Sequence, residues 1–508
     1  MYKFFKSYNF IFYKVKIFLI FLFFALISFS GLNLSKLDDE ITIKHTLINK
    51  TPITIFEPKI DNKNNILIFI AHGFAGSSSF MKSIALSLAN TGYKTITFDF
   101  LGHGRHSKPY SGNIMKETGA TKIFVKQTEL IIGSFLKKND NYKAIIIGHS
   151  MASDIIFRVA NLNDNIIGSI GISNYTDQIK KKQPNNVLII NGIWEKQLRN
   201  KALSILESIG IKNPKENVLY GSFRDGSARK SQYIKNSDHV GILYSQNSQL
   251  SINEWVNNAS GNRYKVITNK LGVYTAILFL SIISLYLIIV SLIKKRNFKK
   301  IDVSLLRCLL ANILSGIITP LLLFFFSIKF TAYPAHSYLI NHLFLYGTLA
   351  IIINKIPITL LSIKDFKLSI FTTILCFNTL ILGNILDNYV STFYLTHSRI
   401  QLFIPLIFAC IPISLLIDSY YINEKFIFIK STISKVLLII SLSAAIYLNF
   451  EELFLLGYAI ILLVAFWLVY GFLSHFFIKR LGSFLSISLA NGFTIAWTLA
   501  VAIPIYIK

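Results

Sequence analysis

Cysteine is scarce in this chain of 508 residues, which contains only Cys308, Cys376 and Cys410. All three lie in an apolar C-terminal tract, so the sequence before them has no disulfide framework available. Within apolar helices we expect cysteines to be buried as small hydrophobic side chains. Dinucleotide-binding and P-loop glycine patterns are missing, and no cluster of metal-ligand residues occurs. The sequence therefore predicts no metal and no other cofactor.

Acidic residues are also few, with 25 Asp and Glu against 52 Lys and Arg and a net charge of +27. Such a surplus suggests nucleic acid as a partner only if the basic residues gather on one surface. Between residues 34 and 268, 30 basic and 18 acidic residues are instead scattered, without a basic helix or an aromatic RNA-binding pattern. Much of the remaining charge lies in short loops between apolar runs. This pattern is typical of a membrane protein and disfavours nucleic-acid binding.

Long apolar runs are abundant, and 53% of the residues are hydrophobic. A first run occupies 15–31, whereas residues 34–268 read like a water-soluble domain. Because about 20 apolar residues span the hydrocarbon core of a bilayer, we interpret residues 1–33 as a signal anchor or a cleaved signal peptide. We interpret 269–508 as a membrane domain of about eight helices. These are predicted near 271–293, 303–328, 336–354, 368–386, 399–417, 436–449, 453–474 and 483–506.

The basic residues also predict an orientation, because Lys and Arg accumulate in cytoplasmic loops. Four lysines lie before or within the start of the first run, and residues 294–301 read "KKRNFKKI". Alternation then places thirteen basic residues of the C-terminal tract inside, with Lys364, Lys430 and Lys435 in inside loops, and four outside. The prediction is a multi-pass protein of the cell membrane with residues 34–268 on the extracytoplasmic side.

Residues 34–268 alternate between strand-like and helix-like segments, which predicts an α/β domain with a mostly parallel sheet. Within it, "GHSMA" (148–152) follows the apolar strand "YKAIII" and precedes a helix. Small residues at both ends of G-x-S-x-A allow a sharp strand-to-helix turn that exposes the Ser150 hydroxyl. The shorter pattern G-x-S also occurs at 76–78 and 171–173, but only at 148–150 is it followed by the small fifth residue between strand and helix.

Three further segments accompany this motif in chain order: "HGFAGSSS" (72–79), "GIWEKQL" with Glu195, and "NSDHVGILYS" with His239. Together they resemble the α/β-hydrolase superfamily over roughly 45–255. The resemblance implies a Ser150–Glu195–His239 triad. Asp225 and Asp238 remain alternatives for the acid.

The same resemblance implies an oxyanion hole formed by the backbone N–H groups of Phe74 and Met151. Asp99 in "FDFLGHG" is expected to be structural. His103, His106 and His149 are expected to be loop or supporting residues rather than bases.

The implied function is a serine hydrolase that cleaves an ester or another acyl bond, possibly that of a lipid, through an acyl-enzyme on Ser150. The cap segment is short, at 174–185, and carries Lys180, Lys181 and Lys182. It is either a solvated loop or part of an open site that meets anionic headgroups. The alternative function, from another class, is a transport or scaffold protein with a non-catalytic hydrolase-like domain. Membrane lipids are expected partners, and protein partners are left open.

The polar residues of the membrane domain gather at the predicted outer ends of its helices. They form either an interfacial layer or a polar face that presents lipid. We expect the helices to help the exported domain to reach lipid-embedded acyl esters. The residues concerned are His336, His342, Asp387, His397, Arg399, Glu451 and Glu452.

Overall fold

The chain forms two compact units. A sheet unit comprises Phe29–Ile277 with the short stretch Asp387–Thr392, and a helical unit comprises most of the remainder. The computed structural model describes residues 2–59, 64–113, 116–137, 141–296, 300–326, 328–357, 366–422 and 425–507.

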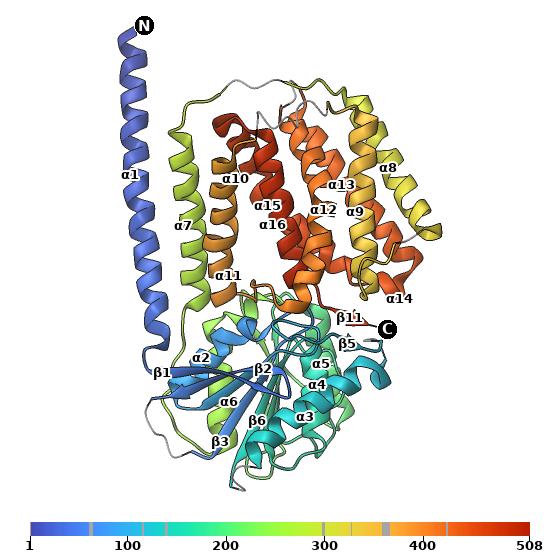
Figure 1. Ribbon diagram of the computed structural model, residues 1–508. Helices are drawn as coiled ribbons and strands as arrows, with labels where there is room; N and C mark the ends of the chain where they lie inside the picture. The colour runs from blue at the N-terminus through green and yellow to red at the C-terminus, as the bar shows by residue number, and fades with distance from the viewer. Residues whose placement is uncertain are drawn as a thin grey trace. The chain divides into compact units, whose positions relative to one another are not determined.

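The sheet unit alternates strands and helices along the chain, as the sequence predicts (Figure 1). Its strands are β1 (Ile41–Ile48), β2 (Thr51–Pro58), β3 (Ile66–Ala71), β4 (Lys94–Phe98), β5 (Tyr110–Ser111), β6 (Lys143–His149), β7 (Ile166–Ile172), β8 (Val187–Gly192), β9 (Leu219–Tyr220) and β10 (Arg229–Ile234). Its helices are α2 (Lys82–Thr91), α3 (Lys122–Leu136), α4 (Met151–Ala160), α5 (Lys196–Ser208) and α6 (Gln246–Ser260), with short 3₁₀ or π turns at Lys36–Asp38, Ser78–Met81, Glu117–Thr121 and Gly241–Leu243.

Nine strands form one sheet in the order β1-β2-β4-β3-β6-β7-β8-β10-β9. From β4 to β10 every neighbouring pair is parallel, whereas β1, β2 and β9 are antiparallel to their neighbours. The β1–β2 hairpin turns at Asn49 and Lys50, both with positive φ, as a tight two-residue hairpin requires. The predicted α/β class with a mostly parallel sheet is confirmed.

Helices cover both faces of the sheet: α2 packs with α6, and α3 packs with α4 on the opposite side (Figure 1). All residues of β3 and β8 are consequently buried. This double cover explains why the central strands are continuous apolar runs rather than alternating ones.

The carboxyl ends of the parallel strands meet at one edge of the sheet. Ala71 of β3 pairs with Gly148 of β6, and β7 and β8 continue the same direction. The loops that follow β3, β6, β8 and β10 therefore meet at this edge. In this order they contain the segment that begins at His72, then Ser150, Glu195 and His239. In parallel α/β sheets this is the edge where ligands bind.

The helical unit contains most of the apolar sequence. Its elements are α1 (Tyr2–Ser35), α7 (Leu271–Ser291), α8 (Leu305–Phe325), α9 (Pro334–Asn354), α10 (Leu368–Leu375), α11 (Gly383–Tyr389), α12 (His397–Ser419), α13 (Ile427–Leu448), α14 (Phe450–Leu453), α15 (Leu456–Leu481), α16 (Phe484–Ala502) and β11 (Tyr506–Ile507), with a π segment at Cys376–Leu382 and a 3₁₀ turn at Tyr420–Ile422.

Within the part of the chain that the structure describes, nine helical segments are long and apolar enough to cross a membrane. One near the N-terminus covers Tyr13–Asp38, and the other eight correspond to the predicted runs. The largest shift concerns the run at 436–449, because α13 already begins at Ile427. Lys430 and Lys435 therefore lie inside this helix, so their assignment to a loop was wrong. Residues 297–299 of the basic loop and Lys364 lie outside the described residues.

Several polar residues of the helical unit are buried within the protein. His336, His342 and Arg399 are each at most 1% exposed, whereas His397 and Glu451 are exposed. Arg399 donates from one guanidinium nitrogen to the Ala500 and Ile503 carbonyls at 2.7 and 3.0 Å. These carbonyls lie at the C-terminus of α16, where backbone acceptors lack partners within the helix. Arg399 therefore stabilises the end of a neighbouring helix.

The cysteines are only partly as predicted. Cys308 and Cys410 are buried, but Cys376 is exposed. It begins the π segment at Cys376–Leu382, which joins α10 to α11.

Candidate active site

Ser150 occupies a strained turn between β6 and α4. Its φ of 52° and ψ of −118° lie outside the regions that non-glycine residues prefer. One close approach explains the glycine of G-x-S-x-A: a Cβ on Gly148 would come within 2.5 Å of the Ala152 carbonyl oxygen. The loop after β3 is also close to the serine, because a Cβ on Gly73 would lie 3.1 Å from the Ser150 Cβ. The turn therefore lifts the Ser150 side chain beyond the end of the strand.

His239 links the serine to an acid. Its Nε2 lies 3.0 Å from Ser150 Oγ, and its Nδ1 lies 2.6 Å from Glu195 Oε1. Since the carboxylate accepts the Nδ1–H, Nε2 is the acceptor for the serine O–H. The structure thus brings together the three side chains that the sequence singled out from three separate loops.

Glu195 is held by donors on its second oxygen. Glu195 Oε2 accepts the Gly192 N–H at 2.6 Å and the Ser173 hydroxyl at 2.9 Å. Burial raises the pKa of Glu195. The hydrogen bonds from His239, Gly192 and Ser173 together lower this pKa by more than burial raises it, so the net pKa lies below the usual range. A carboxylate in this environment stays ionised and orients the imidazole.

The two alternative acids have other partners. Asp225 accepts the N–H and the hydroxyl of Ser227, at 3.0 and 2.6 Å. Asp238 accepts the backbone N–H groups of Val240 and Gly241, so it holds the turn that follows His239. Of the three carboxylates, Glu195 is the one that contacts the histidine.

Two further residues support this site, and the sequence predicted a supporting role only for His149. Ser173, with φ of 52°, follows β7 and belongs to the G-x-S pattern at 171–173, for which the sequence predicted no role. For His149 the sequence predicted a supporting role but did not indicate which group it contacts. Its Nε2 lies 2.9 Å from the His239 carbonyl oxygen, and its Nδ1 has no hydrogen-bond partner among the described residues.

His149 is electrically neutral in this position. Burial and, to a smaller extent, the neighbouring His239 lower its pKa to about 4, although the hydrogen bond to the His239 backbone opposes this effect. A neutral His149 whose Nε2–H donates to the His239 carbonyl holds the loop without adding charge beside the triad. The GHS sequence alone gave no signal of this partner, since it lies 90 residues away.

The segment after β3 is anchored by Asp99. Asp99 Oδ1 accepts the Ser78 N–H at 2.6 Å, and Oδ2 accepts the Arg105 N–H at 2.9 Å. Gly104, with φ of 51°, packs so tightly on this carboxylate that a Cβ would lie 2.5 Å from it. Asp99 therefore joins the loop at 73–78 to the loop at 102–105, which is the structural role expected of it.

The two predicted oxyanion donors belong to segments that adjoin the serine. Met151 follows Ser150 in the chain, and Phe74 belongs to the loop that packs against it. Met151 is the first residue of α4, and Phe74 follows Gly73, which packs against Ser150. A backbone N–H at the start of a helix is well suited to stabilise negative charge. Phe74 and Met151 stay predictions as oxyanion donors.

His103 and His106 bind within their own loop. His103 Nδ1 lies 2.8 Å from the Leu101 carbonyl, and its ring stacks on that of Tyr110. His106 Nδ1 accepts the Lys108 N–H at 3.0 Å. Both contacts agree with the expectation that they are loop residues.

The cap segment at 174–185 is fixed rather than loosely solvated. Arg229, 2% exposed, donates to the carbonyl of Pro184 at 2.8 Å and to those of Lys180 and Lys181 at 3.4 Å each. The Thr176 hydroxyl donates to Asp154 Oδ1 at 2.5 Å. The three lysines are exposed.

Residues 62–221 match the family described as Serine aminopeptidase, S33. The sheet unit is an α/β-hydrolase domain. The matched family and the motif order make the protein a serine hydrolase. No curated protein matches the chain in sequence. In the described parts of the chain, no three or more His, Cys, Asp or Glu side chains lie together so as to hold a metal ion.

Several solved structures are similar to this domain. A predicted CIB-like hydrolase from Thermoplasma acidophilum has 17% identity and a TM-score of 0.32, over 43% of this chain and 99% of its own. A soluble variant of monoglyceride lipase from Saccharomyces cerevisiae has 12% identity and a TM-score of 0.32, over 43% and 94%. A membrane phospholipase A described as a bacterial virulence factor has 12% identity and a TM-score of 0.31, over 51% and 99%. At such values nothing about their substrates transfers to this chain.

Proposed function

We propose that this protein is a membrane-bound serine hydrolase that cleaves acyl esters of lipids with Ser150, His239 and Glu195 as its catalytic residues. The observation that supports it most is the single imidazole that lies within hydrogen-bonding distance of both the Ser150 hydroxyl and the Glu195 carboxylate. Such a relay activates an otherwise weak nucleophile.

In the proposed mechanism, Ser150 Oγ attacks the acyl carbonyl carbon while His239 Nε2 takes the hydroxyl proton. Glu195 stabilises the imidazolium that forms. The N–H groups of Phe74 and Met151 donate to the oxyanion, and one such donor is typically worth about 10²–10³ in rate. His239 then gives its proton to the leaving alcohol oxygen, and the acyl-enzyme on Ser150 is cleaved by water, which His239 activates.

A lipid substrate is supported by exposed apolar residues beside the triad in sequence. Trp194, which precedes Glu195, is 67% exposed, and Val240, which follows His239, is 44% exposed. Tyr175, in the cap segment that follows Ser173, is 48% exposed. Apolar side chains that remain in water at a functional edge mark a surface for apolar ligands. Lys180, Lys181 and Lys182 add positive charge suited to anionic headgroups.

The lipid substrate is testable with full-length protein and two assays, one with a short soluble ester and one with phospholipid vesicles. The double substitution Trp194→Ser/Val240→Ser is expected to leave soluble-ester hydrolysis within a fewfold of the parent and to reduce vesicle hydrolysis at least tenfold. Leu162→Ser is the matched control, since Leu162 is 73% exposed but lies between α4 and β7, at the opposite edge of the sheet. Equal vesicle hydrolysis by parent and double variant would contradict the lipid assignment while leaving the hydrolase intact.

The membrane location and orientation belong to the same proposal. The nine apolar helices support membrane insertion, and the basic loops support an extracytoplasmic α/β-hydrolase domain. Under this topology the helices keep the domain at the bilayer surface and help it to reach lipid-embedded esters.

A further inference from the structure

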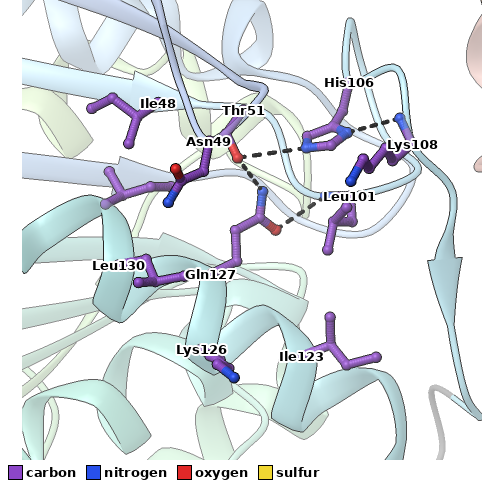
Figure 2. Close-up of a pocket in the computed structure, with 11 residues that line it drawn as sticks. Ile48, Asn49, Thr51, Leu101, His106, Lys108, Ile123, Lys126, Gln127 and Leu130 are labelled. Carbon is purple, nitrogen blue, oxygen red and sulfur yellow. Dashed lines mark hydrogen bonds between the residues drawn. The ribbon is translucent and has the colours of Figure 1, made fainter. Parts of the chain in front are cut away.

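The α/β-hydrolase domain contains a second cavity that does not include the triad. Its volume is about 200 Å³, and it opens between the β1–β2 hairpin, the loop after β4 and helix α3 (Figure 2). The eleven residues that line it include neither Ser150, Glu195 nor His239.

The strand registers place this cavity at the same edge of the sheet as the serine, but to one side. Phe98 of β4 pairs with Ala71 and with Ile53 of β2, and Ala71 pairs with Gly148. Thr51 in the cavity and Ser150 thus lie at equivalent heights, with three strand spacings between β2 and β6. At about 4.8 Å a spacing the separation is roughly 14 Å, which is too far for the cavity to be part of the catalytic contact.

The walls of the cavity are mostly apolar, with a polar side that is already hydrogen-bonded. Gln127 reaches from α3 toward Thr51 (Figure 2), donating to its hydroxyl at 3.0 Å and accepting the Leu101 N–H at 3.1 Å. His106 Nδ1 accepts the Lys108 N–H, so His106 Nε2 carries a proton and faces Thr51 Oγ1 at 3.5 Å. The aliphatic side chains lining the cavity are Ile48, Leu101, Ile123, Leu130 and Ile131.

The charged side chains that line the cavity have one sign. Lys108 and Lys126 are exposed lining residues, and none of the lining residues is acidic. Neither lysine forms an ion pair within the described residues. Burial lowers the pKa of His106 to about 4, against the pull of Asp99, so this histidine adds no charge. The two lysines are therefore left for a negatively charged ligand.

We propose that this cavity binds the carboxylate form of a single-chain fatty acid, with the alkyl chain among the aliphatic side chains and the carboxylate at the rim, where the exposed Lys108 and Lys126 supply positive charge. The size supports one chain rather than two. An apolar cavity of about 150 Å³ holds a benzene molecule, whereas pockets for larger ligands measure about 300–1,000 Å³. Such an acid would also be a product of the proposed reaction, but the binding site does not depend on that reaction.

The test is photocrosslinking of the full-length, detergent-solubilised protein with a medium-chain fatty acid that carries a diazirine at its alkyl end. The matching alcohol serves as the uncharged probe, and labelled peptides are identified by mass spectrometry. We expect labelling by the acid within 48–51 and 122–131, weaker with the alcohol and at high salt, because exposed charge pairs are screened. Labelling should persist in Ser150→Ala, which separates this site from the catalytic one.

Two variants then localise the binding. Lys108→Gln/Lys126→Gln should reduce labelling of these peptides about five- to tenfold, as expected for two exposed ion pairs, whereas Lys116→Gln/Lys122→Gln should not, since those lysines do not line the cavity. Leu130→Trp, at a half-exposed lining position, should block the alkyl chain. Equal labelling by acid and alcohol, or labelling unchanged by both the lysine pair and Leu130→Trp, would overturn the proposal even if Ser150 proves catalytic.

Discussion

Replacing Ser173 by alanine tests the support of the acid without touching the reacting atoms. The Ser173 hydroxyl donates to Glu195 Oε2 at 2.9 Å, and the side chain is 1% exposed, so water cannot readily replace it. A hydrogen bond to a charged group is worth about 1.5–3 kcal/mol. The Gly192 N–H still donates to the same oxygen in the variant. We therefore expect Ser173→Ala to lose about half of this free energy as transition-state stabilisation. A loss of about 1.4 kcal/mol corresponds to a tenfold lower kcat/KM.

The control is Ser169→Ala in strand β7, which Ser173 directly follows. Ser169 is also fully buried, and its hydroxyl has no hydrogen-bond partner in the described structure. Ester hydrolysis and the rate of fluorophosphonate labelling should fall about tenfold in Ser173→Ala and stay near the parent rate in Ser169→Ala. Equal rates in the two variants would refute the idea that Ser173 positions the acid.

The pH dependence of stability gives a second readout for Ser173→Ala. The depressed pKa of Glu195 means that its ionisation contributes stability above its unfolded pKa, about 4.3, and that this contribution is lost as the pH falls through the folded pKa. Removing one donor raises the folded pKa and makes the contribution smaller. The melting temperature of Ser173→Ala should therefore lie below that of the parent at neutral pH, and the gap should narrow in acid. A difference in melting temperature that does not change with pH would indicate that Ser173→Ala destabilises the protein through lost packing and not through Glu195.

Three further predictions concern other parts of the chain. His149→Phe removes the donor to the His239 carbonyl and should lower kcat about tenfold with little change in KM, measured on a soluble ester; an unchanged kcat would show that this bond does not position His239. Arg229→Met leaves the carbonyls of Lys180, Lys181 and Pro184 without their donor, and at about 1–3 kcal/mol for buried unpaired groups it should lower the melting temperature and speed tryptic cleavage at 180–182. Protection equal to the parent would contradict the anchoring role. Reporters fused after residue 250 and within 294–301 should read opposite sides of the membrane, and agreement between them would refute the topology.

The sequence predicted those parts of the site that depend on local motifs. A strand, a small-residue turn and a helix around Ser150 are encoded within about ten residues, and the buried strands are visible as apolar runs. Chain order then pointed to Glu195 and His239. The choice of Glu195 over Asp225 or Asp238 depended on how loops far apart in sequence fold, which only the structure displayed.

Contacts over long sequence separations were beyond such reasoning. The bonds from Ser173 to Glu195 and from His149 to the His239 carbonyl join different loops, and no local pattern marks them. Helix boundaries failed for another reason. Lys430 and Lys435 are charged, and lysines near a helix end can extend toward polar surroundings. A hydropathy run bounded by charge therefore begins only at 436, whereas α13 already begins at Ile427.

The central claim is that Ser150 is the nucleophile of this hydrolase. The most direct measurement is labelling of full-length protein with a fluorophosphonate probe, with the modified residue identified by mass spectrometry, in the parent, Ser150→Ala and Ser153→Ala. Ser153 is the control because it lies in the first turn of α4, close to Ser150, but donates its hydroxyl to the Ser150 carbonyl oxygen, at 2.6 Å. The account predicts one adduct, on Ser150, absent from Ser150→Ala and retained in Ser153→Ala. Undiminished labelling of Ser150→Ala, or no labelling of a folded parent protein, would contradict it.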